Sequence, residues 1–206
     1  MIFIRGVNLK LHPEGEALSD HIRRENDFFE SHILDFIRDN FPVHGTILDV
    51  GANVGNHSAY FANFLKYRQI LAFEPIPDNY ILLVQNCAFY RAFYPFKFAI
   101  SNQEQLIHLT PNKANMGASM VTPDGEIEVI AIPLDLLNLY DCTLIKLDVE
   151  YHEPKVLLGA YKTIEKNKPL ILIEDSAEEY AKLLPDYDCI QGWDEDRTYL
   201  YKWVGQ

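Results

Sequence analysis

The chain has 206 residues, enough for one substantial hydrophobic core, and 48% apolar and 23% charged residues are typical of a soluble globular protein. Its formal net charge of −12 argues against binding to duplex nucleic acid or to an anionic membrane surface, because lysine and arginine dominate both kinds of recognition. A neutral or cationic small molecule, or a sugar, fits this charge better.

The cysteines and the N-terminus indicate a reducing, intracellular environment. Cys87, Cys142 and Cys189 are widely spaced and form no C-x-x-C pair, which argues against a zinc or redox motif. The N-terminal MIFI is too short for a signal peptide and is followed by Arg5. No run approaches the roughly 18 apolar residues of a membrane span. We expect a soluble cytoplasmic protein, which could be one domain of a longer chain.

The first 45 residues predict a helical lead-in. Between Leu18 and Asn40, apolar residues recur at helical spacing, which predicts one or two helices there. Pro42 and Gly45 end this region. We therefore divide the chain into residues 1–45 and a domain of residues 46–206.

Residues 46–206 predict an α/β fold, because short apolar runs alternate with helical ones. The near-continuous apolar character of the runs is that of parallel strands covered on both faces. The predicted strands are TILDV (46–50), QILAFE (69–74), PFKFAIS (95–101), TLIKLDV (143–149) and PLILIE (169–174), and helices begin near residues 56, 78, 153 and 176.

Two segments depart from this alternation. Residues 103–133 hold LIHL and EIEVIAI around a Pro-Asp-Gly turn at 123–125, which favours a β-hairpin insertion. Near the end, YDCIQGW (187–193) and RTYLYKW (197–203) flank DEDR and predict an antiparallel pair. A parallel sheet that ends in an antiparallel hairpin, with helices on both faces, indicates the class I methyltransferase form of the Rossmann-like fold.

The stretch ILDVGANVGNHSAYFA (47–62) predicts a ligand-binding turn between a strand and a helix. Gly51 and Gly55 can adopt positive φ angles and leave no Cβ between backbone and ligand. A dinucleotide fingerprint is disfavoured because Asn53 and Asn56 stand at two of its glycine positions, and no P-loop lysine follows. The remaining pattern suits S-adenosylmethionine, with its amino group near Asp49 and its carboxylate at the helix start.

A second acid supports the same ligand. Glu74 in FEP (73–75) ends the next strand about 20 residues after the glycine turn, where a carboxylate can bond both hydroxyls of an adenosine ribose. By itself Glu74 could equally be a solvated strand-end acid. The predicted cofactor-binding residues are Asp49, Gly51, Asn53, Gly55, Asn56, His57, Glu74, Pro75 and Ser101.

These motifs resemble one family. LDVGANVGNHSAYFA, AFEPIPDNYILLVQN, FAIS, NMGAS and IKLDVEYHEPKVLLGA follow, in order and spacing, the motifs of FkbM-type S-adenosylmethionine-dependent methyltransferases, over residues 47–174. The resemblance implies a class I fold and methylation of hydroxyl oxygens on sugars, glycans or secondary metabolites. One difference bears on the acceptor: Tyr151 and His152 stand where the family usually has Gly-Ala after DVE.

The sequence KLDVE places Lys146, Asp148 and Glu150 on one face of a strand, because strand side chains alternate. Three charges on a buried strand are costly unless they are paired or functional. One interpretation is a Lys146–Asp148 salt bridge. The other is a catalytic site in which Asp148 is the general base for an acceptor hydroxyl, Glu150 orients that hydroxyl, and His152 is an alternative base.

Several further residues have open assignments. With Asp148, the strand-end acids Glu174 and Asp175 could hold Mg²⁺, although we expect an acidic rim without metal. Residues 115–119 could cover the cofactor or form a plain turn. Packing suffices to explain Asn79, Asn86, Trp193 and Tyr199, although the last two could stack on a sugar.

Three functions follow from these observations. The first is an O-methyltransferase that acts on a sugar, glycan or other hydroxyl-bearing metabolite. The second is an NAD-dependent oxidoreductase, which the missing glycines disfavour. The third is a cofactor-binding module without catalysis, conceivable because of Tyr151 and His152.

Overall fold

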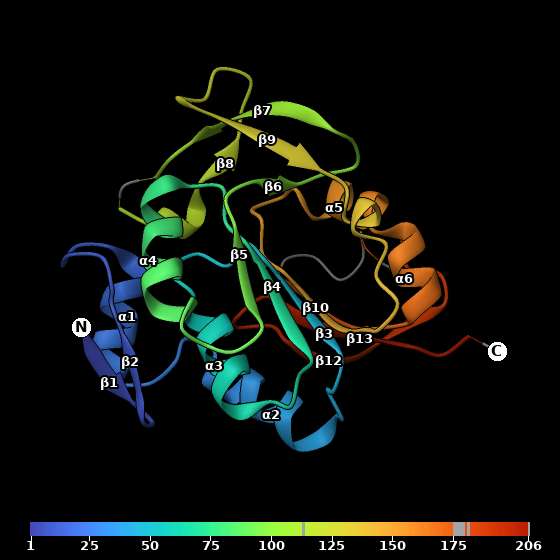
Figure 1. Cartoon of the computed structure of the whole chain (residues 1–206), viewed down its shortest axis with the longest axis horizontal. Coiled ribbons are helices and arrows are strands. Elements are labelled where there is room, and N and C mark those ends of the chain that lie inside the picture. The colour runs from blue at the N-terminus through green and yellow to red at the C-terminus, as the bar shows by residue number, and fades with distance from the viewer. Residues whose placement is uncertain (113, 175–179, 181, 206) are drawn as a thin grey trace.

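The apolar runs of residues 46–206 assemble into one seven-stranded sheet (Figure 1). The computed structural model describes residues 1–112, 114–174, 180 and 182–205. Across the sheet the order is β12 (Tyr187–Trp193), β13 (Thr198–Trp203), β11 (Leu170–Glu174), β10 (Cys142–Leu147), β3 (Thr46–Val50), β4 (Gln69–Phe73) and β5 (Phe93–Phe96). The five strands from β11 to β5 pair in parallel, whereas β13 is antiparallel to both of its neighbours. The predicted fold class and terminal hairpin are therefore confirmed.

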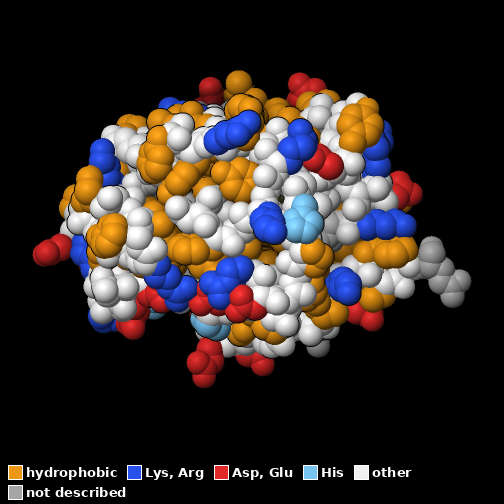
Figure 2. Space-filling view, turned by 60° about the horizontal axis from the view of Figure 1, so that its bottom comes forward, with side chains coloured by type: hydrophobic (Ala, Val, Ile, Leu, Met, Phe, Trp, Pro, Cys, Tyr) orange, Lys and Arg blue, Asp and Glu red, His pale blue; other side chains and the backbone are white. Residues whose placement is uncertain are grey.

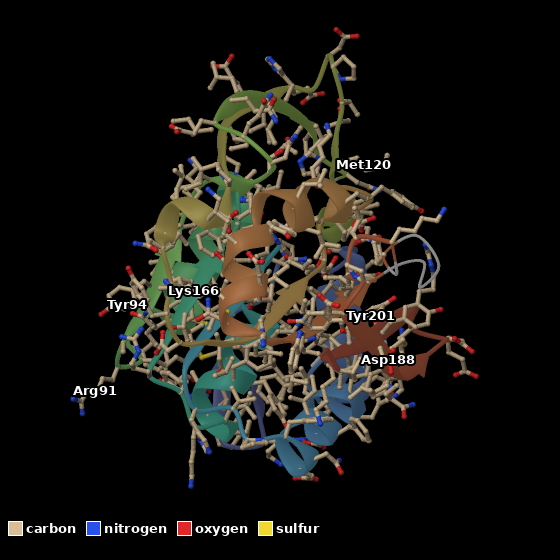
Figure 3. The ribbon with its side chains drawn as sticks, turned by 90° about the vertical axis from the view of Figure 1, so that its right-hand side faces the viewer. Arg91, Tyr94, Met120, Lys166, Asp188 and Tyr201 are labelled. Atoms are coloured by element: carbon tan, nitrogen blue, oxygen red, sulfur yellow. The ribbon has the colours of Figure 1, made fainter. Side chains whose placement is uncertain are left out.

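Helices cover both faces of this sheet, as the period-two alternation of its strands requires. On β3, Ile47 packs with the helices of one layer, whereas Leu48 and Val50 pack with those of the other. The first layer contains α1 (Ala17–Glu25), α2 (Ser31–Asn40), α3 (Asn56–Phe64) and α4 (Pro77–Cys87). The second contains α5 (Glu153–Gly159), α6 (Tyr161–Asn167) and the 3₁₀ turn η2 (Leu134–Leu137). Figure 3 shows α6, with Lys166, in front of the sheet.

A second, four-stranded sheet stands above the carboxyl ends of the parallel strands (Figure 1). Its order is β6 (Ala99–Ile100), β9 (Ile127–Ile132), β7 (Gln105–Thr110) and β8 (Met120–Val121), and the 3₁₀ turn η1 (Met116–Ala118) precedes β8. The predicted insertion is confirmed, since β7 and β9 pair antiparallel around the 123–125 turn. Its inward side chains form a small apolar cluster with Ile76.

Three local features differ from the sequence prediction. The run 95–101 is divided between β5 and β6, which belong to different sheets, and Pro95 lies in the edge strand β5, where a missing N–H is tolerated. The helix predicted from residue 153 is two short helices, α5 and α6. The N-terminus adds an unpredicted antiparallel pair, β1 (Ile2–Ile4) and β2 (Val7–Leu9). The helix predicted near residue 176 falls largely outside the described residues.

The N-terminal 45 residues pack on the same core as the sheet. Ile4, Leu9 and Ile22 are buried together with Ile47 of β3. The amide of Asn86 in α4 fixes this arrangement, because it accepts from the Lys10 N–H at 2.7 Å and donates to the Lys10 and Val54 carbonyls at 2.8 and 2.7 Å. The packing role expected for Asn86 therefore has a specific form: it ties the N-terminal segment to the glycine turn.

The surface has basic side chains among the acidic ones that give the chain its negative net charge. On the face shown in Figure 2, basic and acidic side chains lie interspersed among apolar ones. Among the described residues, no helix is both long and apolar enough to cross a bilayer.

Candidate functional site

Two pockets open at the carboxyl edge of the parallel strands. The first, of about 630 Å³, is called the apolar pocket: Ile76, Phe98, Ile100, Ile107 and Leu109 line it together with Glu74. The second, of about 790 Å³, is called the carboxylate pocket, and Asp148, Glu150, Glu174, Lys146, His57 and Phe29 line it. The pockets share five lining residues: Gly51, Asn53, Gly117, Asp148 and Glu150. A ligand in one pocket can therefore meet a ligand in the other at these residues.

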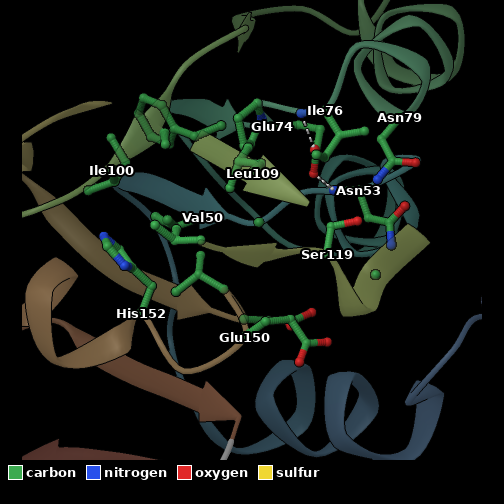
Figure 4. Close-up of a pocket in the computed structure, with 18 of the residues that line it drawn as sticks. Val50, Asn53, Glu74, Ile76, Asn79, Ile100, Leu109, Ser119, Glu150 and His152 are labelled. Atoms are coloured by element: carbon green, nitrogen blue, oxygen red, sulfur yellow. Dashed lines mark hydrogen bonds between the residues drawn. The ribbon is translucent and has the colours of Figure 1, made fainter. Parts of the chain in front are cut away.

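Glu74 directly follows β4 and lines the apolar pocket. Its side chain is buried, and its two oxygens accept the backbone N–H groups of Asn53 at 2.8 Å and Ile76 at 2.7 Å (Figure 4). Burial raises the pKa of Glu74 to about 7. A carboxylate offers about four acceptor positions, so two remain for hydroxyl donors. An adenosine ribose with its base on the apolar wall fits this arrangement.

The two glycines of the turn have the predicted positive φ angles, and both are also closely packed. Gly51 has φ 79°, and a Cβ there would lie 1.7 Å from the backbone oxygen of Asp148 on the neighbouring strand. Gly55 has φ 86°, and a Cβ there would lie 2.9 Å from the side chains of Cys87 and Leu83. Close packing within the protein and the positive φ angles both disfavour larger residues at these positions, and the predicted approach of a ligand stays a prediction. Gly51 nevertheless lines both pockets.

The other residues near the turn that were predicted to bind the cofactor lie in different places. Asn53 lines both pockets and has a left-handed φ of 50°. The Asn56 amide is bonded to the backbone N–H and C=O of Phe29 at 3.1 and 3.2 Å, so it holds the α1–α2 connection. His57 lines the carboxylate pocket, not the apolar one. Pro75 lines the apolar pocket beside Glu74, as predicted.

Asp49 does not line either pocket, so the ligand contact expected for it stays a prediction. The side chain is fully buried, and its Oδ2 accepts from the Ser58 hydroxyl at 2.6 Å. Its Oδ1 lies 3.5 Å from Lys146 Nζ and has no hydrogen-bond partner among the described residues. Asp49 therefore acts inside the sheet, as a counter-charge for Lys146.

Ser101 and His152 form a pair at the far end of the apolar pocket. The Ser101 hydroxyl lies 3.0 Å from His152 Nε2, and both side chains are buried. Of the two, only His152 lines the pocket, next to Ile100 and away from Asn53 (Figure 4). Burial lowers the pKa of His152 to about 4, so it is neutral and a weak proton acceptor. This placement argues against the base role considered for His152.

The predicted Lys146–Asp148 salt bridge is present, with Nζ 3.2 Å from Asp148 Oδ2. Lys146 Nζ also donates to the Gly51 carbonyl at 2.7 Å. Burial favours a raised pKa for Asp148, but Lys146 and a hydrogen bond from Glu174 outweigh it and hold the pKa below its usual value. Burial and the Asp148 carboxylate raise the pKa of Glu174 well above its usual value, which favours its protonated form. The lowered pKa makes Asp148 better suited to orienting a hydroxyl than to accepting its proton.

The metal site considered at the ends of β10 and β11 stays a hypothesis. No group of three or more potential metal ligands is found within ranges 1–112, 114–174, 180 and 182–205. Asp175, considered with Asp148 and Glu174, lies outside the described residues. Trp193 and Tyr199 do not line either pocket, and Trp193 packs edge-on against Phe36 at a ring distance of 5.4 Å.

The sequence analysis did not identify most of the residues that line the two pockets. Ala17, Leu18 and His21 of α1 line the carboxylate pocket, and Ile107 and Leu109 of β7 line the apolar pocket. For Ile107 and Leu109, the alternation of side chains in LIHL (106–109) could have shown that both residues lie on one face of a strand. Residues of the 115–119 loop line both pockets, and the Glu16 carboxylate links this loop to α1, since it accepts from the Met116 N–H at 3.2 Å and from the Ser19 N–H at 2.8 Å.

The segment after β10 is conformationally strained. Glu150 and Tyr151 both adopt left-handed angles, with φ 51° and 67°, and Tyr151 is exposed. Such angles are unfavourable for residues with a Cβ and cost glycine almost nothing. Tyr151 thus occupies a position that suits the glycine usual in the resembling family.

Tyr151→Gly is therefore expected to raise the free energy of unfolding by about 1 kcal/mol, measured by urea denaturation. Tyr161→Gly is the matched control, because Tyr161 is similarly exposed but has an ordinary φ at the start of α6. That control should lose about 1 kcal/mol. A loss of stability in Tyr151→Gly would show that the tyrosine side chain outweighs the backbone strain.

Comparisons with known proteins agree with this geometry. The family model of the methyltransferase FkbM domain matches residues 49–201. No curated protein sequence matches the chain. A structure of methyltransferase FkbM from Methylobacillus flagellatus KT is 20% identical with a TM-score of 0.58, over 78% of this chain and 44% of that one. The chain thus spans less than half the length of that relative.

Two further structures share the fold. The Escherichia coli yhhF protein, assigned as a methyltransferase, is 12% identical with a TM-score of 0.59 and covers 100% of this chain and 99% of its own. Aeropyrum pernix fibrillarin, with natively bound S-adenosyl-L-methionine, is 13% identical with a TM-score of 0.51, over 84% of this chain and 74% of its own.

Proposed function

The chain belongs to the FkbM methyltransferase family and uses S-adenosylmethionine as its cofactor, and from this premise we propose that it methylates a hydroxyl oxygen of a sugar, a glycan or a small metabolite. The observation that carries the proposal is the junction of the two pockets. An apolar pocket with a ribose-binding acid meets a polar, carboxylate-lined pocket at Gly51, Asn53, Gly117, Asp148 and Glu150.

The apolar pocket would hold the adenosine end of the cofactor. Glu74 would accept the ribose hydroxyls, and Ile76 and Ile100 would contact the adenine. When bound, the cofactor supplies an electrophilic methyl group on a sulfonium. The protein's contribution is to place an acceptor oxygen in line with that methyl group, and positioning of this kind accounts for a large part of such rate enhancements.

The carboxylate pocket would hold the acceptor. Asp148 and Glu150 line both pockets, so their oxygens can accept a hydrogen bond from an acceptor hydroxyl at the junction. Glu174 donates its one O–H to Asp148, and its other oxygen can accept a hydrogen bond from the acceptor. Phe29 and His21, whose rings meet edge-on at 5.1 Å, add an aromatic wall suited to the face of a sugar ring.

An oxidoreductase predicts different ligand behaviour, whereas a non-catalytic module would differ only in turnover. A thermal-shift comparison should show S-adenosylmethionine and S-adenosylhomocysteine raising the melting temperature, because ligands that bind only the native state stabilise it. NAD should leave it unchanged. Stabilisation by NAD alone would exclude the proposal.

Turnover tests the reaction itself. The expected result is S-adenosylhomocysteine formation with one or more members of a panel of alkyl glycosides and simple alcohols, and a product methylated on oxygen by mass spectrometry. We expect the rate to persist in EDTA, because Lys146 already pairs with Asp148 and Glu174 favours its protonated form. Complete loss in EDTA that Mg²⁺ restores would instead assign a metal to Asp148 and Glu174. Methylation of nitrogen or carbon alone would exclude an O-methyltransferase.

A further inference from the structure

Transfer of a methyl group to a hydroxyl leaves one proton to be removed, and the residues predicted for this task are poorly placed for it. Asp148 is paired with Lys146 and hydrogen-bonded to Glu174. Glu174 favours its protonated form. His152 faces the opposite end of the apolar pocket and bonds to Ser101. The inference below rests on the proposed function and concerns the carboxylate pocket.

His57 lines that pocket from the first turn of α3. Its side chain is only 7% exposed, and its Nε2 lies 3.1 Å from Oε2 of Glu30, whose side chain is also 7% exposed. The contact is short but poorly aligned, so Nε2 has no hydrogen-bond partner among the described residues. A small rotation of the ring would complete a bond to Glu30. A buried imidazole beside a buried carboxylate is the arrangement of a base and its orienting acid.

The side chain of Glu30 contacts His57 and Thr198 and does not cap the helix α2. It occupies the N-cap position of α2, yet its side chain makes no capping hydrogen bond. Instead, its Oε1 accepts from the Thr198 hydroxyl at 2.9 Å while Oε2 faces His57. Its backbone has φ 55°, a left-handed angle that is unfavourable for a residue with a Cβ. Strain of this kind persists where the surrounding structure fixes a side chain for function.

The surroundings also restrict the imidazole ring. His57 stacks on Phe61 with a ring distance of 6.2 Å and an interplanar angle of 19°, and Phe29 lies 6.4 Å away on the pocket wall. His57 is also close enough to Asp148 to stabilise that carboxylate electrostatically. An imidazolium at this position would therefore have the carboxylates of Glu30 and Asp148 as neighbours.

We propose that His57, oriented by Glu30, is the catalytic residue that takes the proton from the acceptor hydroxyl. With Nε2–H directed at Glu30, Nδ1 carries the free lone pair. As the acceptor oxygen forms its bond to the methyl carbon, the carbon–sulfur bond breaks, its electron pair stays on sulfur, and the hydroxyl proton passes to Nδ1. The products are the methyl ether, neutral S-adenosylhomocysteine and an imidazolium. Glu30 is a positioning residue, and Asp148 orients the hydroxyl.

The tautomer of His57 tests the proposal without an acceptor. In ¹⁵N spectra at pH 8 with S-adenosylhomocysteine bound, and with the signal assigned by its loss in His57→Gln, Nε2 should be protonated and Nδ1 should not. Glu30→Gln should lower the fraction of this tautomer. An Nδ1–H tautomer, or protonation of both nitrogens at pH 8, would overturn the proposal, because Nδ1 could not then accept a proton.

Kinetics with the best acceptor from the glycoside and alcohol panel give the second test. His57→Gln should lower kcat by about 10²–10⁴-fold, with the KM for the acceptor and the affinity for S-adenosylhomocysteine changed by less than threefold. His108→Gln is the control, an imidazole on β7 that lies near Glu128 and lines neither pocket, and its kcat should stay near the wild-type value.

The possible results distinguish an error in the role of His57 from an error in the proposed methyltransferase function. A kcat within threefold of wild type in His57→Gln would overturn the role of His57 and leave the methyltransferase function intact. Failure of every hydroxyl acceptor would remove the proposed function, while the tautomer measurement would still decide whether His57 is poised as a base. Equal losses in His57→Gln and His108→Gln would indicate a general effect of replacing a histidine and would also overturn the assignment.

Discussion

Lys146→Met is expected to lower the free energy of unfolding by about 3–5 kcal/mol, the range for removing one member of a buried ion pair. Lys146 is buried between Asp49 and Asp148, which together raise its pKa although burial alone would lower it. Without the ammonium, Asp49 is left as a fully buried carboxylate whose Oδ1 has no other partner among the described residues. Urea denaturation followed by circular dichroism measures the effect.

Two variants show whether the charge pairing causes this loss. Lys146→Met combined with Asp49→Asn should recover part of the stability, because the second change removes the uncompensated charge. Lys97→Met, at an exposed lysine, should change stability by less than about 0.5 kcal/mol. If Lys146→Met lost under 1 kcal/mol, the buried triad would not be an important part of the fold.

Glu74→Gln is expected to weaken S-adenosylhomocysteine binding by about 1.5–3 kcal/mol, roughly 10- to 150-fold, the range for hydrogen bonds to a charged group. The amide keeps the size of the side chain but loses the charge and one acceptor oxygen. Titration calorimetry measures the affinity. Asp78→Asn is the matched control, because Asp78 is exposed four residues further along, in the first turn of α4, and the affinity should be unchanged.

The same residue predicts a pH dependence of binding. Burial raises the pKa of Glu74 to about 7, and only the ionised form can accept hydrogen bonds with all of its oxygen lone pairs. Affinity should therefore be highest above pH 7 and fall as the pH decreases through that value, whereas Glu74→Gln should show no such change. A wild-type affinity that is constant from pH 8 to pH 6 would contradict the assignment of Glu74 as the ribose-binding acid.

The sequence alone determined the layout of the chain, because that layout depends on local patterns. Apolar runs such as TILDV and PLILIE specify buried parallel strands, and the terminal antiparallel pair follows from two β-rich runs around DEDR. The position of Glu74 at the end of β4 follows from the same pattern, since parallel strands bring their carboxyl ends to one edge. The Lys146–Asp148 pair also follows from strand alternation.

Only the tertiary structure decided what each polar side chain contacts. Asn56 binds the backbone of Phe29, 27 positions away, and Asp49 faces Lys146 across neighbouring strands, so neither contact has a signature in local spacing. Gly51 is required because the Asp148 carbonyl of the next strand occupies the space of a Cβ. Glu30 and His57 meet because α2 and α3 pack together on one face of the sheet. Local patterns fix elements and their faces, whereas pairings between distant residues depend on how those faces pack.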